Sequence, residues 1–503
     1  MSLIMKNLFI TVAIGAALSV TACSEDAEGT QDQHKNIVKA PVTSAEWYKA
    51  GADVIAAKKA QAINTNTAKN VILFVGDGMG ISTLTAARIL QGQQRGETGE
   101  ENLLSFETLP YTAIVKTYNT DMQVADSAGT ASSMNTGMKT RIGVISEGPE
   151  QTRGQCLGAK GNLSITLAER MEESGYATGV VSTARLTHAT PAAVYAHSPD
   201  RNWENDSELP EEAVKNGCKD IAAQLIEFSS GDGLEVALGG GRRNFLPKSG
   251  GGKRADGRNL TQEWINSDAK ARYVDTLEGL KAATPENTSR LLGLFNDSHM
   301  KFEVDRSESE PSLAEMTEKA ISFLRDKGKG YYLMVEAGRV DHAHHGGNAR
   351  RALQDTIALS DAVEKALEMI DLSDTMVLVT ADHSHVFTMA GYSERGNPIL
   401  GVVKARGETA KGEDGKPYTS LGYGNGPGYI EGPRPDLTNA MAMDKNYRQL
   451  STVPLKSETH GGEDVALFAV GPWAHLVRGT IEQNVIYHYM VNALGLNDEE
   501  KVE

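Results

Sequence analysis

The sequence is short of positive charge. Lys and Arg number 50 against 66 Asp and Glu, which gives a formal net charge of −16. Proteins that bind the phosphate backbone of nucleic acids do so with basic surfaces, so this balance disfavours nucleic acid as a partner. It does not exclude a small phosphate-bearing substrate, because a deep metal cluster can dominate the local electric field whatever the overall charge.

The N-terminus lacks an apolar stretch long enough to cross a bilayer. Lys6 precedes an apolar run over 8–20, and small residues then lead directly to Cys23. This layout predicts a signal peptide over 1–22, and the residues before Cys23 resemble a bacterial lipoprotein cleavage site. We expect an exported chain, periplasmic or held at the outer membrane only by lipid on Cys23. A polar tether would then cover 23–45. Secretion without a lipid is the alternative.

Cysteine is also scarce. Three are present, and once Cys23 is assigned to processing, Cys156 and Cys218 remain. An oxidising compartment outside the cytoplasm favours a disulfide between these two. Two buried free thiols are the alternative.

What the sequence does contain is the composition and pattern of a globular protein. It is 40% hydrophobic and 23% charged, and 503 residues can bury a large core. Short apolar runs that end in polar, glycine-rich turns are typical of buried parallel strands. They cover 70–75, 176–182, 235–238, 331–335, 376–380 and 466–470. Helical periodicity covers 163–174, 312–325 and 349–370.

This alternation predicts an α/β fold, with a doubly wound, mostly parallel central sheet and helices on both faces. We assign one domain over 46–503. Two regions, at about 249–289 and 391–457, are polar or rich in glycine and show no clear helix or strand pattern. We interpret both as long surface insertions, and loops of that length usually have a function.

Carboxylates and imidazoles follow three of the predicted strands, at the sheet edge where α/β proteins bind ligands. Mixed Asp and His donors suit Zn²⁺, whereas oxygen donors alone suit Mg²⁺. Asp341 and His345 stand four residues apart, on one face of a helical turn, and with His460 they would form a three-ligand zinc site with an open position. Asp382 and His383 would join Asp77 around a second zinc.

A further carboxylate and a serine complete the pattern. Glu336, with a second oxygen of Asp77, would hold magnesium. Ser127 begins a helical stretch of small residues, and a helix N-terminus favours an anionic phosphate. Metal coordination would lower the pKa of its hydroxyl, which makes it a candidate nucleophile. Taken alone, the Asp126-Ser127 pair also suits a plain helix cap.

Together these residues resemble the signatures of the alkaline phosphatase family. The resemblance runs from about 70 to about 494 and keeps the family's order. The motifs are Val75-Gly-Asp-Gly-Met-Gly80, Asp126-Ser-Ala-Gly-Thr130, Glu336-Ala-Gly-Arg-Val-Asp-His-Ala-His-His345, Thr380-Ala-Asp-His-Ser384 and Thr459-His-Gly-Gly-Glu-Asp464. The resemblance implies hydrolysis of phosphate monoesters to alcohol and phosphate through a phosphoserine, and it implies a homodimer.

The resemblance also implies a role for each site residue. Ser127 would be the nucleophile and Arg201 the phosphate clamp, since a guanidinium pairs with two phosphate oxygens. The first zinc would bind Asp341, His345 and His460, the second Asp77, Asp382, His383 and Ser127, and magnesium Asp77, Thr190 and Glu336. The family pairs cysteines at the positions of Cys156 and Cys218.

The sequence departs from parts of the family pattern. His188 and His342 replace the Asp and Lys of enteric bacterial relatives, so contacts to phosphate and magnesium should differ. Asn296 stands where animal relatives carry a carboxylate near a calcium site, so we do not predict a calcium site. The region 391–457 resembles the variable, crown-like insertion that relatives place at the dimer interface or over the active site. A related phosphodiesterase or phosphonate-ester hydrolase and a non-catalytic metal- or phosphate-binding lipoprotein are the competing hypotheses.

Overall fold

The computed structural model describes residues 41–496. The predicted signal peptide, Cys23 and most of the predicted tether lie outside the described residues. Within 41–496, no helix combines the length and the apolar character needed to cross a membrane.

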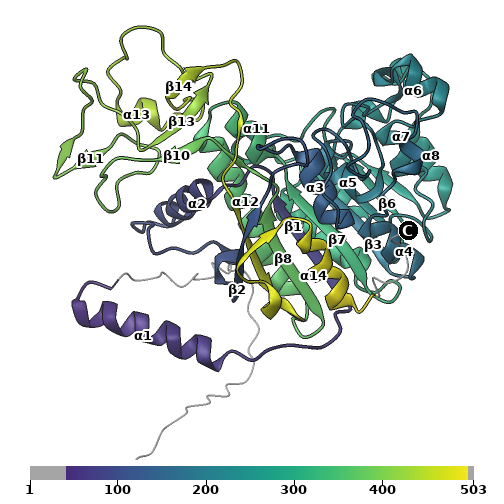
Figure 1. Cartoon of the computed structure of the whole chain (residues 1–503), viewed down its shortest axis with the longest axis horizontal. Helices are drawn as coiled ribbons and strands as arrows, with labels where there is room; N and C mark the ends of the chain where they lie inside the picture. Colours follow the sequence, from purple (N-terminus) through teal and green to yellow (C-terminus); the bar gives the residue numbers. More distant parts are fainter. Residues whose placement is uncertain (1–40, 497–503) are drawn as a thin grey trace, which may run out of the picture. The chain divides into compact units, whose positions relative to one another are not determined.

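A ten-stranded sheet forms the centre of the described chain, in the order β17-β2-β16-β8-β1-β7-β3-β4-β6-β5 (Figure 1). The strands are β1 Asn70–Gly76, β2 Tyr111–Lys116, β3 Ala177–Arg185, β4 Val236–Gly240, β5 Arg272–Val274, β6 Leu291–Leu294, β7 Tyr331–Ala337, β8 Thr375–Ala381, β16 Val465–Val470 and β17 Thr480–Glu482. From β8 to β5 every pair is parallel. This confirms the predicted α/β class and the mostly parallel sheet.

The predicted parallel strand at 466–470 is wrong in direction, because β16 runs antiparallel to both β8 and β2. The chain reaches β16 through β15 (His460–Gly461), which pairs with β9 (Ser384–His385) just beyond the carboxyl end of β8. The strand therefore starts at that edge and must run back across the sheet. An apolar run carries no sign of its direction, so the sequence could not reveal this.

Helices cover both faces of the sheet. On one face α10 (Leu313–Leu324) and α12 (Ala349–Met369) pack against each other and against β7. The other face carries α4 (Leu167–Glu173) and α5 (Ala189–Tyr195) on β3 and β7, with α14 (Val485–Leu494) on β1, where Figure 1 shows it in front of the strands.

The helix expected over 163–174 begins late, at Leu167. Thr166 caps it, because its hydroxyl accepts a hydrogen bond from the Glu169 amide. The Glu169 carboxylate in turn accepts the Thr166 amide. This capping box satisfies free N–H groups at the helix start and so fixes the boundary.

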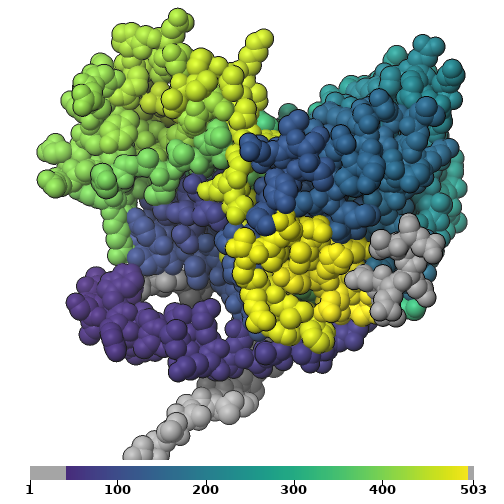
Figure 2. Space-filling model, in the orientation of Figure 1, coloured from purple at the N-terminus to yellow at the C-terminus, as the bar shows by residue number. Residues whose placement is uncertain are grey.

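The two predicted insertions contain more regular structure than we expected. The region 249–289 includes α8 (Leu260–Ser267), β5 and α9 (Leu277–Ala282), and β5 is an edge strand of the main sheet. The region 391–457 includes β13 (Leu421–Gly426) and β14 (Ser451–Pro454), which form a three-stranded sheet with β10 (Phe387–Met389). Figure 2 shows this second region, in green, gathered on one side of the molecule.

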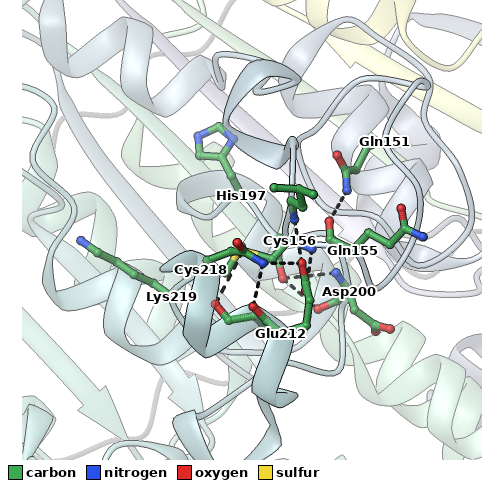
Figure 3. Close-up of a disulfide and its surroundings, with 12 residues drawn as sticks. Gln151, Gln155, Cys156, His197, Asp200, Glu212, Cys218 and Lys219 are labelled. Atoms are coloured by element: carbon green, nitrogen blue, oxygen red, sulfur yellow. Dashed lines mark hydrogen bonds between the residues drawn. A yellow bond between two sulfur atoms is a disulfide. The ribbon is translucent and has the colours of Figure 1, made fainter.

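Cys156 and Cys218 form the predicted disulfide (Figure 3). The bridge closes a loop with a sequence separation of 62 residues. In the chain-entropy description, closing a loop of this size stabilises the fold by about 4 kcal/mol. Glu212 braces the bridge, because its carboxylate accepts the backbone N–H groups of Cys156 and Leu157. The loop begins before β3 and ends after Arg201, so it encloses several predicted site residues.

Candidate active site

Three carboxylates meet at the carboxyl edge of the central strands. β1 lies between β7 and β8, with Val75 opposite Glu336 and Gly76 opposite Ala381. Asp77 and Asp382 are the next residues after β1 and β8, so both enter the same space as Glu336. All three side chains are 0% exposed.

Gly78 makes the turn after β1 possible. Its φ is +70°, a left-handed conformation that glycine adopts without a steric penalty. A Cβ at this position would lie 2.4 Å from the His385 ring. The Gly78 amide donates to Asp382 Oδ1 at 2.9 Å, so the turn also holds one carboxylate in place.

The first group of predicted ligands is Asp341, His345 and His460. Asp341 and His345 share one face of α11 (Arg339–His345), and His460 comes from β15. Asp341 Oδ1 lies 3.2 Å from His345 Nε2 and 3.3 Å from His460 Nε2, and the two imidazole nitrogens are 3.2 Å apart. Ligands at zinc distances in a tetrahedron are separated by about 3.3 Å, so these three atoms fit one ion.

The second group is Asp77, Asp382, His383 and Ser127. His383 Nε2 is 3.4 Å from Asp77 Oδ1 and 3.4 Å from Asp382 Oδ2. Ser127 Oγ lies 3.1 Å from the same nitrogen. The structure therefore brings the candidate nucleophile together with the residues predicted for a second zinc, and the spacing again fits tetrahedral ligands.

Ser127 opens helix α3 (Ser127–Thr136) and is 2% exposed. Asp126 caps this helix, because its carboxylate accepts the Gly129 amide at 3.2 Å. Sequence analysis left a nucleophile and a helix cap as alternatives for this pair. In the structure Asp126 is the cap, and Ser127 faces the ligand cluster.

The third group is Asp77, Thr190 and Glu336. Glu336 accepts a hydrogen bond from Ser182 at one oxygen. One nitrogen of His188 and one oxygen each of Asp77 and Glu336 lie within 4.8 Å of one another, close enough to hold one metal ion. His188 therefore adds a nitrogen donor to a site that sequence analysis expected to be made of oxygen.

Many atoms of these groups are buried without a hydrogen-bond partner. Within residues 41–496 the unpartnered atoms include both oxygens of Asp77, Asp382 Oδ2, Glu336 Oε1, Thr190 Oγ1 and His188 Nδ1. A buried carboxylate that lacks a partner is costly, and divalent cations offset that cost. The oxygen and imidazole donors suit zinc in the first two groups, and the third group offers magnesium mostly oxygen.

The pKa values of the three buried carboxylates are all raised. Burial, reinforced by Asp382 and Asp341, raises the pKa of Asp77 well above its ordinary value. Burial likewise raises the pKa of Asp382 to about 6 and that of Glu336 to about 7. Burial is the main cause of all three shifts and repulsion between the carboxylates adds to it, and a bound cation would reverse them.

Arg201 reaches the site from the loop after α5. Its Nη1 donates to Asp126 Oδ2 at 2.9 Å, and its Nη2 lies 3.1 Å from His188 Nε2. Burial alone would lower the pKa of this guanidinium, but Asp126 outweighs burial and raises it. Asp126 thus orients a charged fork beside Ser127.

Histidines crowd the space around the third group. The His188 and His342 rings are 5.3 Å apart between centroids, so the structure brings the two predicted variable positions together. The His299 ring lies tilted against that of His342, with centroids 3.9 Å apart, and it meets His188 edge-on at 5.4 Å. Sequence analysis missed His299, which lies outside every motif.

His385 was also missed. Its Nε2 lies 2.9 Å from Asp341 Oδ1, and its Nδ1 lies 2.5 Å from Glu458 Oε2. The sequence offered one signal, since His385 stands two residues after His383, and in the structure it ends the short strand β9. Nothing local identified Glu458 as its partner.

The chain matches the family model described as Alkaline phosphatase over residues 68–496. It is 44% identical over 449 residues to an alkaline phosphatase of Gadus morhua, covering 86% of this chain and 93% of the relative. It is 42% identical over 509 residues to the tissue-nonspecific isozyme of alkaline phosphatase from Felis catus, covering 97% and 93%. The solved alkaline phosphatase of Thermus thermophilus aligns with a TM-score of 0.63 at 25% identity, covering 88% of this chain and 94% of that one.

Proposed function

Because the chain belongs to the alkaline phosphatase family of phosphoric monoester hydrolases, we propose that it cleaves phosphate monoesters through a covalent phosphoserine on Ser127. One observation carries the proposal. Ser127 opens α3, and its hydroxyl lies 3.1 Å from His383 Nε2 and faces buried carboxylates with oxygens that lack hydrogen-bond partners. A helix-capping serine needs no such surroundings.

The three groups would hold the metals of the family. The first and second groups would each bind one zinc, and the third group one magnesium. When bound, zinc supplies Lewis acidity that lowers the pKa of hydroxyl groups and neutralises charge on the transferred phosphate. The second group includes Ser127 itself, so this effect would reach the nucleophile.

Arg201 would hold the phosphate by two parallel hydrogen bonds to its oxygens. Asp126 fixes the guanidinium, and the free N–H groups at the start of α3 add positive partial charge on the same side. The phosphorus would then lie in line with Ser127 Oγ, the geometry that lowers the entropic cost of attack.

The reaction would proceed by two displacements. Ser127 Oγ forms a bond to phosphorus as it loses its proton, and the ester P–O bond breaks to release the alcohol, which takes up a proton. Water then forms a bond to phosphorus, the P–Oγ bond breaks, Ser127 regains its proton and inorganic phosphate leaves. His188 and His342 would contact the phosphate through water.

Further proposals follow from the sequence and, for the homodimer, from the family. We propose a single domain over 46–503, export from the cytoplasm, lipid attachment at Cys23 and assembly as a homodimer. Phosphate monoesters are the substrates, and the membrane is reached only through the lipid.

Replacement of the nucleophile tests the proposal. Ser127→Ala should lose most turnover of a chromogenic monoester while metal analysis shows that zinc is retained. Ser133→Ala is a matched control, because Ser133 is equally buried on the same helix and lies outside all three groups. Rapid mixing of the unmodified enzyme should release one burst of alcohol per active site.

Two results would contradict the proposal. Normal monoesterase activity in Ser127→Ala would exclude this nucleophile. Faster turnover of a diester than of a monoester of the same alcohol would favour a phosphodiesterase instead.

A further inference from the structure

We propose that the Glu458 carboxylate is a positioning residue for the first group of ligands, acting through His385 on Asp341. The inference rests on the proposed function, because it takes the first group to be a zinc site. It assigns a role to a residue at the end of the 391–457 insertion.

The geometry is a continuous chain of short contacts. Glu458 Oε2 lies 2.5 Å from His385 Nδ1, and His385 Nε2 lies 2.9 Å from Asp341 Oδ1. Glu458 is 1% exposed and the other two side chains 4% each, so water does not compete for these bonds. A carboxylate on the far nitrogen of an imidazole fixes the rotation of the ring. The ring in turn fixes the oxygen of Asp341 that would face zinc.

Glu458 also holds a second member of the first group, by its main chain. Its carbonyl accepts His345 Nδ1 at 2.5 Å, and its amide donates to the His345 carbonyl at 3.0 Å. Its remaining carboxylate oxygen accepts the Val386 amide at 2.8 Å. His460, the third member, follows two residues later. Glu458 therefore contacts His345 directly, reaches Asp341 through His385, and stands two residues before His460.

The insertion sets the position of Glu458. Asn425, in β13, exchanges two hydrogen bonds with Thr459, at 2.9 and 3.0 Å. Gly426, at the end of β13, has φ +132°, and a Cβ there would lie 3.0 Å from Glu458 Cβ. The small sheet β10-β13-β14 thus clamps the segment that returns to the metal site. Through Glu458, the insertion becomes part of the support for the first group.

Zinc affinity of the holoenzyme tests the proposal. In Glu458→Gln one oxygen that now accepts a hydrogen bond becomes an NH₂ donor, so His385 loses its charged partner and either His385 or Val386 loses its acceptor, while the main-chain bonds to His345 remain. Loss of such a supporting carboxylate lowers metal affinity by about 10–100-fold. Transfer of zinc to a chromogenic chelator should show that loss for one zinc per chain, with the second unchanged. Glu431→Gln, an exposed acid in the same insertion, should leave both unchanged.

A second variant distinguishes loss of the supporting contact from misfolding. Glu458→Asp keeps the charge but withdraws it by one methylene, and it should show a similar loss of zinc affinity. The proposal also requires action through His385, so Glu458→Gln combined with His385→Asn should lose no more zinc affinity than His385→Asn alone. Cobalt in place of zinc should show an altered visible spectrum in Glu458→Gln, and excess zinc should restore turnover.

The outcomes separate the inference from the function on which it rests. Unchanged zinc affinity in both Glu458 variants, or fully additive losses with His385→Asn, would overturn the positioning role. Asp341→Asn provides the reference, because it removes a direct ligand. If Asp341→Asn also kept both zinc ions, the assignment of the first group itself would be wrong.

Discussion

The Asp126→Asn substitution tests how the phosphate clamp is held. Asp126 Oδ1 accepts Asn119 Nδ2 at 2.9 Å and the Gly129 amide at 3.2 Å, while Oδ2 accepts the Gly143 amide at 3.0 Å and Arg201 Nη1 at 2.9 Å. An asparagine can accept on one side only. Its NH₂ group would then face two donors, either Asn119 and Gly129 or Gly143 and the Arg201 guanidinium, and the negative charge beside Arg201 would be lost.

The size of the effect follows from these four contacts. A hydrogen bond to a charged group contributes about 1.5–3 kcal/mol, and a donor left unsatisfied adds a further penalty. We expect Asp126→Asn to lower the free energy of unfolding by about 2–4 kcal/mol. A less well oriented Arg201 should also weaken phosphate binding by about 1–2 kcal/mol, which is about a 5–30-fold rise in the inhibition constant of inorganic phosphate.

Urea unfolding and competitive inhibition by phosphate measure the two effects. Asp121→Asn is the control, because Asp121 is exposed and accepts only the Ile142 amide at 2.9 Å among the hydrogen bonds of the described chain. A variant with lower stability but an unchanged inhibition constant would show that Asp126 serves the helix alone. Unchanged values of both would refute the reasoning.

Three further predictions concern the bridge, the third group and a buried acid. Replacing Cys156 and Cys218 together by Ser should lower the free energy of unfolding by about 4 kcal/mol; a loss below 1 kcal/mol in thermal unfolding would contradict this. His188→Asp makes the third group all oxygen, so it should retain magnesium more strongly in dialysis against metal-free buffer; equal retention would count against His188 as a donor. Burial raises the pKa of Glu147 to about 8, so Glu147 favours the folded state only while protonated. Stability should fall between about pH 4.5 and 8, and Glu147→Gln should remove that part of the slope in urea unfolding.

Much of the architecture could be predicted because parallel strands buried on both faces leave a plain apolar run in the sequence. β1, β7 and β8 each show it, and ligand residues directly after them could be assigned to one sheet edge. The structure confirms this α/β class and brings all the predicted ligands together. Their roles stay predictions.

The features that escaped prediction depend on contacts between distant segments. The direction of β16 is set by the position of β15. The strand β13 (Leu421–Gly426) contains three glycines and so lacks an apolar run in the sequence, and it is held by backbone pairing with β10. His385 gains its role from Glu458, which no local pattern links to it. His299 lies in a loop, and only the fold brings its ring against that of His342.

The pairing of β15 with β9 also determines when the enzyme can become active. His460 joins its group only after β9 is in place, and Asp77 comes from the first strand of the sheet. Nearly the whole chain must therefore be synthesised and folded before the first group, which needs His460, is complete. A nascent or still unfolded chain therefore lacks the complete ligand set of the proposed zinc pair. We expect loading of both zinc ions, and the activity that depends on them, only at the end of folding.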